Sequence, residues 1–237
     1  MTSSWSNWAR TERANPVLMV SPRNPGEVQM AVRRALETGH AVKPIGASHS
    51  FTAIGATDGI SLRFNNMRGL VDVDTTRDRV TLWAGTHLWE LPQILDPLGL
   101  ALPNMGDIDA QTIAGATQTG THGTGLGLGG LATGIVGLTL IDGTGEIVEI
   151  DESNPDLLSA AALSLGALGV ITTITLQCVP RFLLCAEESP AQLEDVLNNY
   201  LEISRTADHF EFYWFPHTKS VRTKTNTRLG VDEQPVP

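Results

Sequence analysis

The chain reads Pro44-Ile45-Gly46-Ala47-Ser48-His49-Ser50-Phe51 where a predicted strand, residues 41–45, runs into a tight loop. A loop of Gly, Ala and Ser can turn consecutive backbone N–H groups toward one side, and such a concave run of amides binds anions without any basic side chain. The segment therefore predicts a binding loop for a phosphorylated ligand, with His49 beside that ligand. Taken alone, His49 is more simply explained as an ordinary surface histidine.

The residues before this loop predict a strand, a helix and a second strand. Residues 17–20 are apolar, and Asn24-Pro25-Gly26-Glu27 is typical of a helix start, with Asn24 as N-cap and Glu27 closing a capping box. Apolar residues follow at helical spacing, and Gly39 predicts the end of the helix. A unit of this kind predicts two parallel strands side by side, with residues 46–51 at their carboxyl end.

A second unusual segment is rich in glycine, because 12 of the 23 glycines lie between Gly106 and Gly145. A flexible linker would explain this, but linkers are poor in apolar residues, and here Ile, Leu and Val alternate with the glycines. The pattern favours backbone packed closely against another group. Its centre reads Gly115-Ala116-Thr117-Gln118-Thr119-Gly120-Thr121-His122-Gly123-Thr124-Gly125, whose hydroxyl and amide side chains suit the polar edges of a cofactor. The alternative is a buried loop whose Thr side chains cap its own turns.

The remaining elements follow from hydrophobic spacing and turn residues. Neither unusual segment matches the Gly-x-Gly-x-x-Gly of a Rossmann turn or the Gly-Lys-Ser/Thr of a P-loop. We expect a domain boundary near Pro180, dividing the chain into residues 10–180, with subdomains of about 10–70 and 71–180, and residues 181–237. The expected strands are 60–64, 69–73, 80–84, 135–141, 146–150, 170–179 and an aromatic strand at 209–215, and the expected helices are 88–98, 157–164 and an acidic helix at 187–204.

Composition narrows the class of protein. Of 237 residues, 41% are hydrophobic and 18% charged, with a formal net charge of -10. We expect no nucleic-acid partner, since phosphate backbones require a surplus of Lys and Arg on one face. Cys178 and Cys185 lack metal-ligand spacing, so we expect two buried thiols, a reducing compartment and no metal.

The uncharged residues 157–180 are long enough to raise the question of a membrane span. They are rich in Gly, Ser and Thr, however, and their second half alternates like a strand, so we expect a helix, a turn and a strand. The N-terminus shows no secretory signal. The sequence therefore predicts a cytoplasmic protein without an integral membrane segment, with peripheral association with a membrane as the alternative.

Three segments occur in the order seen in the vanillyl-alcohol-oxidase-type, or PCMH-type, FAD-binding family. They are residues 46–51, residues 115–125, and Ser164-Leu165-Gly166-Ala167-Leu168-Gly169-Val170-Ile171. The chain more closely resembles the branch of gulonolactone, arabinonolactone and galactonolactone oxidases or dehydrogenases and alditol oxidases. Two further segments resemble that branch, so the resemblance covers nearly the whole chain: Trp5-Ser6-Asn7-Trp8 and His209-Phe210-Glu211-Phe212-Tyr213-Trp214-Phe215-Pro216-His217.

The resemblance implies an α+β fold: a PCMH-type FAD-binding domain of two α/β subdomains, followed by the start of an incomplete α+β substrate (cap) domain. It implies that the first loop holds the FAD pyrophosphate, and that His49 is joined covalently to the flavin 8α carbon. It implies that the second segment passes beneath the isoalloxazine, that Val170 and Ile171 flank the adenine or ribose, and that Gly106 leaves oxygen a path to the flavin. The implied cofactor contacts are Pro44, Ile45, Gly46, Ala47, Ser48, His49, Ser50, Gly106, Asp107, Thr112, Ala114, Gly115, Thr119, His122, Gly123, Val170 and Ile171.

The resemblance also implies a reaction, in which a sugar-1,4-lactone of the L-gulono or D-arabinono type, or a related polyol, passes hydride to flavin. The electrons then go to oxygen or to an electron-carrier protein. The Glu-x-Arg pair and the His-Trp-x-Lys segment that grip substrate in this branch are absent here, so the catalytic residues are unknown and we expect a truncated chain that binds FAD but turns over little lactone. The alternatives are a non-catalytic flavin-binding fragment and a reductase of the same superfamily that takes electrons from NAD(P)H.

Overall fold

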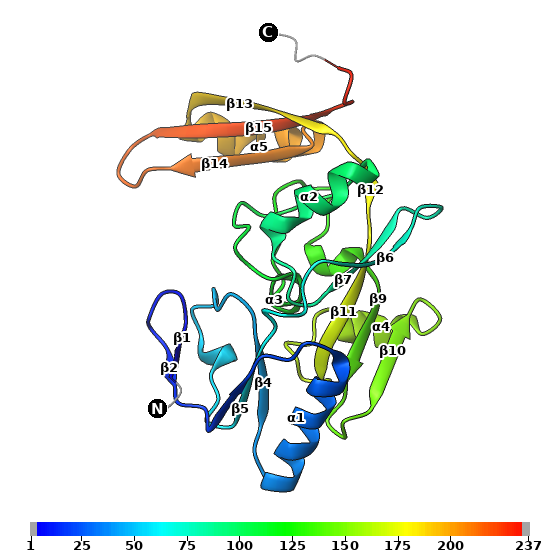
Figure 1. Cartoon of the computed structure of the whole chain (residues 1–237). Helices are drawn as coiled ribbons and strands as arrows, with labels where there is room; N and C mark the ends of the chain where they lie inside the picture. Colours follow the sequence, from blue (N-terminus) through cyan, green and yellow to red (C-terminus); the bar gives the residue numbers. More distant parts are fainter. Residues whose placement is uncertain (1–3, 234–237) are drawn as a thin grey trace.

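The computed structural model describes residues 4–233, so the last four residues of the expected second domain lie outside it. The chain forms three tiers (Figure 1). A small parallel sheet with helix α1 lies lowest, a five-stranded antiparallel sheet with helices α2, α3 and α4 lies in the middle, and a three-stranded sheet with helix α5 lies at the top.

The lowest tier contains the strand–helix–strand unit, but its two strands are not adjacent. The strands are β3 (Leu18–Val20), β4 (Val42–Ile45) and β5 (Ile60–Arg63), in the order β3-β5-β4 and all parallel. The expectation of a side-by-side pair was wrong because β5 lies between them. Ile60, Ser61 and Leu62 of β5 are all almost fully buried, and a strand covered on both faces belongs at the centre of a parallel sheet.

Helix α1 (Pro25–Thr38) begins and ends where the sequence predicts. Asn24 Oδ1 accepts a hydrogen bond from the Glu27 N–H at 3.0 Å, and Gly39 adopts φ 66°, the left-handed conformation that favours glycine. The Glu27 carboxylate accepts a hydrogen bond from the Arg23 N–H at 2.9 Å. In the expected capping box it would accept from the N–H of the N-cap residue Asn24, which is the next residue along the chain. The apolar face of α1 packs into the main core, which fixes the lowest tier to the middle one.

The middle sheet has the order β10-β9-β11-β7-β6, with every pair antiparallel. One hydrophobic cluster runs through this sheet, α1, α3, α4 and β5, so both lower tiers share a single core. The expected strands at 69–73, 80–84, 135–141, 146–150 and 170–179 are each found within a few residues of those bounds. The strands are β6 (Leu70–Asp74), β7 (Arg79–Trp83), β9 (Ile135–Ile141), β10 (Ile147–Asp151) and β11 (Val170–Gln177), and α4 is Pro155–Ala162.

The expected helix at 88–98 is three short helical pieces. They are a 3-10 turn at Leu88–Glu90, α2 (Leu91–Leu95) and a second 3-10 turn at Asp96–Leu98. Pro92 and Pro97 lack the N–H that a continuous helix would need. Short 3-10 turns also occur at Ala53–Gly55 and Leu131–Gly134, and strands β8 (Leu100–Ala101) and β12 (Val179–Pro180) pair beneath the top tier.

The top tier corrects the sequence prediction in one respect. It contains β13 (Leu183–Gln192), α5 (Leu193–Thr206), β14 (His209–Trp214) and β15 (Ser220–Leu229), in the sheet order β13-β15-β14. The acidic helix expected at 187–204 was wrong over its first residues, because residues 187–192 belong to β13. All ten residues of β13 pair with β15, and this long-range pairing overrides the local helical tendency of the acidic stretch.

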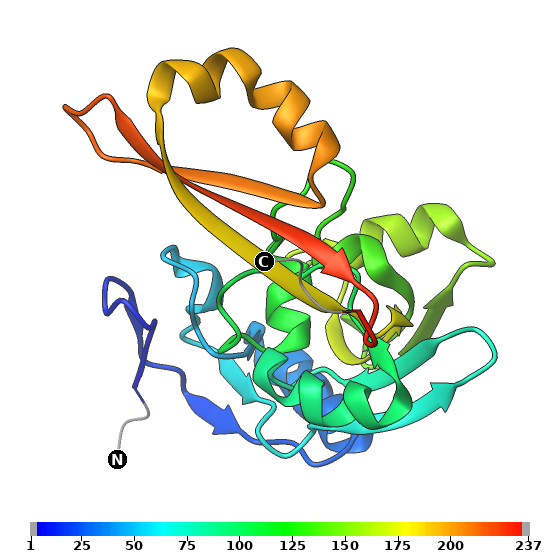
Figure 2. The same ribbon diagram turned by 90° about the horizontal axis from the view of Figure 1, so that it is seen from above.

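The aromatic strand β14 has both a sheet partner and a covering helix. It pairs with β15, and α5 lies along one side of this sheet, as the view from above shows (Figure 2). The Tyr200 ring on α5 lies 6.1 Å from the Phe210 ring and 6.3 Å from the Phe212 ring, measured between centroids. Tyr213 and Trp214, near the end of the strand, remain about half exposed.

The two cysteines differ in burial, against the expectation that both are buried. Cys178 is buried and Cys185 is partly exposed, and both are free thiols. Burial, assisted by the nearby Asp78 carboxylate, raises the pKa of Cys178 from 9.0 to about 11. Because thiolate is the reactive form, we expect a thiol-specific disulfide reagent at pH 8 to modify Cys185 rapidly and Cys178 only after unfolding. Equal rates at both cysteines in native protein would contradict this.

Candidate functional site

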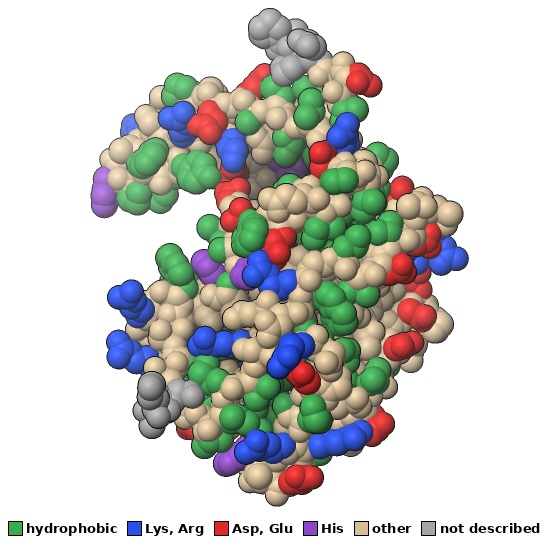
Figure 3. Space-filling model, in the orientation of Figure 1, with side chains coloured by type: hydrophobic (Ala, Val, Ile, Leu, Met, Phe, Trp, Pro, Cys, Tyr) green, Lys and Arg blue, Asp and Glu red, His purple; other side chains and the backbone are tan. Residues whose placement is uncertain are grey.

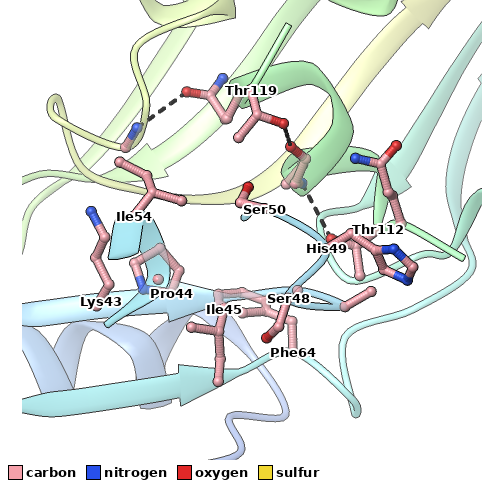
Figure 4. Close-up of a pocket in the computed structure, with 18 of the residues that line it drawn as sticks. Lys43, Pro44, Ile45, Ser48, His49, Ser50, Ile54, Phe64, Thr112 and Thr119 are labelled. Atoms are coloured by element: carbon pink, nitrogen blue, oxygen red, sulfur yellow. Dashed lines mark hydrogen bonds between the residues drawn. The ribbon is translucent and has the colours of Figure 1, made fainter. Parts of the chain in front are cut away.

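A cleft lies between the lowest and middle tiers. Figure 4 shows Lys43, Pro44 and Ile45 on one wall and Thr119 on the opposite wall, with the loop carrying Ser48, His49 and Ser50 between them. The opposite wall consists of α3 (Ile113–Gln118) and the turn at residues 165–169. The cleft and the open solvent at its mouth together contain ≈ 980 Å³ of space that no protein atom fills.

The loop after β4 presents free backbone donors to this cleft. Ala47, Ser48, His49 and Ser50 all line it, and their amides donate no hydrogen bond to any other described residue. Ser48 has φ 60°, the left-handed conformation that turns successive N–H groups toward a common point. Within the described part of the chain, the loop therefore leaves four backbone N–H groups unbonded, as a loop that binds an anion requires.

Gly46 brings this loop into close contact with the opposite wall. A Cβ atom at Gly46 would lie 2.3 Å from Thr112 Oγ1. Thr112 is the N-cap of α3, and its Oγ1 accepts from the Gly115 N–H at 3.2 Å (Figure 4). The two walls thus meet at a point where only glycine leaves room for the cap.

The buried amide of Gln118 joins α3 to the turn at residues 165–169. Its Nε2 donates to the backbone oxygens of Ala161 and Ala162, both at 2.9 Å, and its Oε1 accepts from the Ser164 hydroxyl at 2.8 Å. The turn has left-handed backbone at Leu165, Gly166 and Gly169. Gln118 therefore fixes an irregular turn that completes the cleft wall.

The N-terminal hairpin supports the loop from outside. It is formed by β1 (Trp5–Ser6) and β2 (Arg13–Ala14). Trp5 Nε1 donates to Ser48 Oγ at 2.9 Å, the Trp8 N–H donates to the Ser48 carbonyl at 2.8 Å, and Asn7 Nδ2 donates to the Ser50 carbonyl at 3.0 Å. The Trp8 ring also stacks on His49, with centroids 5.3 Å apart and planes inclined by 16°.

The cleft brings together most of the sequence-predicted cofactor contacts. The predicted residues that line it are Pro44, Ile45, Gly46, Ala47, Ser48, His49, Ser50, Thr112, Ala114, Gly115, Thr119 and Ile171.

Five predicted contacts lie elsewhere. Val170 packs in the main core, because adjacent residues of a strand point to opposite faces. Gly106, Asp107, His122 and Gly123 belong to two segments that pack against each other beside the cleft. A Cβ at Gly106 would lie 3.0 Å from the His122 carbonyl oxygen, and one at Gly123 would lie 2.4 Å from the Met105 carbonyl oxygen.

Sequence reasoning missed half of the cleft. Lys43 is one omission of interest, because it brings a positive charge to the lining of the cleft (Figure 4). Its signal was its position on the strand that leads into the loop. The other missed lining residues are Trp5, Thr52, Ile54, Gly55, Phe64, Ala84, Gln111, Gln118, Leu165, Gly166 and Gly169.

Lys and Arg side chains are scattered over the face of the molecule drawn in Figure 3, and a notch separates the top tier from the tiers below. Within residues 4–233, no group of three or more His, Cys, Asp and Glu side chains is arranged to hold a metal ion. In the same part of the chain, no helix has both the length and the apolar character needed to cross a bilayer.

The site combines a loop with unbonded backbone amides, a facing helix and a cleft between the two lower tiers. Residues 16–151 match the family model described as FAD binding domain, and residues 174–236 match the model described as D-arabinono-1,4-lactone oxidase. The chain therefore belongs to the FAD-binding domain family. Its cleft fits that cofactor, since free amides and Lys43 suit a pyrophosphate, and Ile45, Ile54 and Phe64 suit an aromatic ring system.

Similar proteins agree with this family. The chain is 39% identical over 218 residues to L-gulonolactone oxidase of Mus musculus. The matched region covers 92% of this chain and 50% of that protein. It is 38% identical over 237 residues to L-gulono-1,4-lactone dehydrogenase of Mycobacterium tuberculosis, and this match covers 100% of this chain and 54% of that protein. The chain spans about half the length of the curated relatives it matches.

A solved structure establishes the fold. Cholesterol oxidase from Brevibacterium sterolicum superposes with a TM-score of 0.85 at 18% identity, covering 96% of this chain and 48% of that one. At this identity the likeness concerns architecture alone. The architecture is the α+β, PCMH-type FAD-binding fold.

Proposed function

We propose that this chain holds FAD in the cleft and belongs to an oxidoreductase that oxidises a sugar-1,4-lactone of the L-gulono or D-arabinono type, or a related polyol. The observation that carries the proposal is the run of free amides at residues 47–50, which lines a cleft in a chain of the FAD-binding family. The lactone class is supported by the family model at residues 174–236 and by the names of the relatives. We assign cofactor binding to residues 10–180 and substrate-domain structure to residues 181–237.

The chain's own residues supply binding and orientation. The amides of residues 47–50 would hold the pyrophosphate, and Lys43 would add a positive charge to the cleft, while Gln118 holds the far wall in place. FAD, when bound, supplies the hydride acceptor. Oxygen or an electron-carrier protein then accepts the electrons. The cleft thus acts by positioning the cofactor. Such positioning raises the rate of hydride transfer when the reacting atoms are held in line.

We further propose that His49 is the point of covalent attachment. The bond would join an imidazole nitrogen to the flavin 8α carbon, replacing one C–H bond of the methyl group and the imidazole N–H bond. The electron pair and the two protons released pass to molecular oxygen. Two observations support this assignment: His49 lines the cleft, and its loop is bonded on both sides of it, at Ser48 and at Ser50.

The proposal is tested with purified protein of this sequence. We expect this chain to purify as a yellow protein whose flavin is bleached little by lactone. A longer protein that adds the further half present in the relatives should have its flavin bleached anaerobically by L-gulono- or D-arabinono-1,4-lactone. NADPH serves as the comparison donor. Bleaching by NADPH but not by any lactone or polyol would contradict the proposed substrate class, and failure to bind FAD at all would contradict the cofactor assignment.

Oxygen reactivity is expected to depend on Gly106. We propose that glycine there leaves oxygen a path to flavin bound in the neighbouring cleft. A Cβ at this position would lie 3.0 Å from the His122 carbonyl oxygen, so alanine would crowd it. We expect Gly106→Ala to slow reoxidation of the reduced enzyme by oxygen about tenfold while leaving reoxidation by an artificial dye unchanged. Stopped-flow measurement with both acceptors checks this. Equal slowing of the two reactions would contradict a role of Gly106 in admitting oxygen to the flavin.

A further inference from the structure

The His49 imidazole is held by an aromatic stack instead of by hydrogen bonds. Among the described residues, neither of its ring nitrogens has a hydrogen-bond partner, whereas its face lies on the Trp8 ring at 5.3 Å between centroids. The Phe51 ring approaches Trp8 edge-on, at 6.3 Å and 88°. Both geometries are favourable for aromatic pairs. Trp8 is nevertheless 62% exposed, so burial of its own surface does not account for its position.

The N-terminal hairpin that carries Trp8 is fixed to the loop at residues 46–51 by hydrogen bonds that do not involve the Trp8 ring. The Trp8 N–H, Asn7 Nδ2 and Trp5 Nε1 all donate to Ser48 or Ser50, the two neighbours of His49. The backbone on each side of His49 is therefore restrained, and what remains free is the rotation of the His49 side chain. The Trp8 ring restricts that rotation.

We propose that Trp8 is a positioning residue for His49. The proposal rests on the attachment role assigned to His49 above. A stacked partner covers the face of an imidazole and leaves both nitrogens exposed at its edge, whereas a hydrogen bond would occupy one of them. Trp8 thus holds the ring in one orientation while keeping a nitrogen available for the flavin 8α carbon.

The chain contains a matched control. Trp89 stacks on His87 with centroids 5.8 Å apart and planes inclined by 29°, and it is 45% exposed. Neither His87 nor Trp89 lines the cleft. Trp89→Ala removes a comparable indole–imidazole stack at a comparable exposure and leaves the cofactor loop untouched.

The experiment compares wild type, Trp8→Ala, Trp8→Phe and Trp89→Ala. Each purified protein is incubated with FAD, and the acid-stable fraction of the flavin is followed in time together with total bound flavin. We expect Trp8→Ala to slow acid-stable incorporation about fivefold, equivalent to ~1 kcal/mol, with total flavin unchanged. Trp8→Phe, which keeps an aromatic face, should restore most of the rate, and Trp89→Ala should match wild type.

A second readout separates positioning from general support. Amide hydrogen exchange of residues 7–12, measured by mass spectrometry, should be the same in Trp8→Ala and wild type, because the anchoring hydrogen bonds remain, among them the one from the N–H of residue 8 to the Ser48 carbonyl. Faster exchange together with loss of total flavin would show that Trp8 only supports the loop, and an unchanged incorporation rate would show that it does not act on His49; each result overturns the proposal. If wild type itself holds no acid-stable flavin, the His49 linkage fails first and the role of Trp8 fails with it.

Discussion

Acid precipitation of His49→Ala protein is expected to release all of its flavin into the supernatant, whereas wild-type protein should keep its flavin in the pellet. The change removes the only imidazole that lines the cleft in the described part of the chain. It leaves the backbone amides of residues 47–50 in place, so the variant should still bind FAD without a covalent bond. The measurement is the ratio of flavin absorbance in the two fractions, and the expected change is from nearly complete retention to none.

His122→Ala is the matched control for this result. His122 belongs to the second motif of the sequence, but its side chain is exposed and its Nδ1 lies 2.9 Å from the Gly123 carbonyl oxygen, away from the cleft lining. We expect the control to retain its flavin in the pellet. Release of flavin from His122→Ala and retention by His49→Ala would move the attachment site to the glycine-rich segment and contradict the assignment.

Gly46→Ala is expected to destabilise the protein strongly through a clash between the two walls of the cleft. The added Cβ would lie 2.3 Å from Thr112 Oγ1 and 3.3 Å from Thr112 Cβ, so Thr112 must move and α3 loses its N-cap. Overpacking costs about 1–3 kcal/mol and loss of a cap about 0.5–2 kcal/mol. We expect the free energy of unfolding to fall by about 2–4 kcal/mol, which lowers Tm by about 5–15 °C in a chain of this size.

Two further variants isolate the cause. Gly143→Ala places its Cβ in open space, with nothing within 4 Å, so it should leave Tm nearly unchanged. The double variant Gly46→Ala, Thr112→Ala should be about as stable as Thr112→Ala alone, because the clash disappears with the hydroxyl; a double-mutant cycle by thermal unfolding measures this coupling. If the effects of the two single changes on the free energy of unfolding are simply additive, the close approach of Gly46 to Thr112 does not cause the loss of stability.

The sequence predicted elements whose signals are local. Helix α1 was predicted with both ends because Asn24 and Gly39 cap it through their own conformations. Strand β13 was not predicted, because Glu187, Glu188 and Ser189 show no apolar alternation and the strand is defined by its pairing with β15. The insertion of β5 between β3 and β4 likewise depends on burial from both faces, which a single sequence does not display.

The same distinction applies to the cleft. Residues 44–50 were predicted as a group because a loop of small residues after a strand has a direct physical meaning. Phe64, Ala84 and Lys43 were missed because each lies in or beside a strand, where its residue type indicates ordinary core or surface. Val170 and Ile171 were predicted together, yet only Ile171 lines the cleft, and the choice depends on which face of β11 meets it.

The shared core of the two lower tiers has a consequence for how the cofactor is lost. Phe64, Ala84 and Ile171 line the cleft and also belong to the apolar cluster that joins α1, β5, β7, β9 and β11. Because the two walls share one apolar core, we expect the cleft not to open about a hinge. A ligand bound there raises the stability of the two lower tiers together by mass action. In the His49→Ala protein, whose flavin is not held covalently, heat should therefore release flavin in the same cooperative step that melts the lower tiers, with no earlier phase of escape.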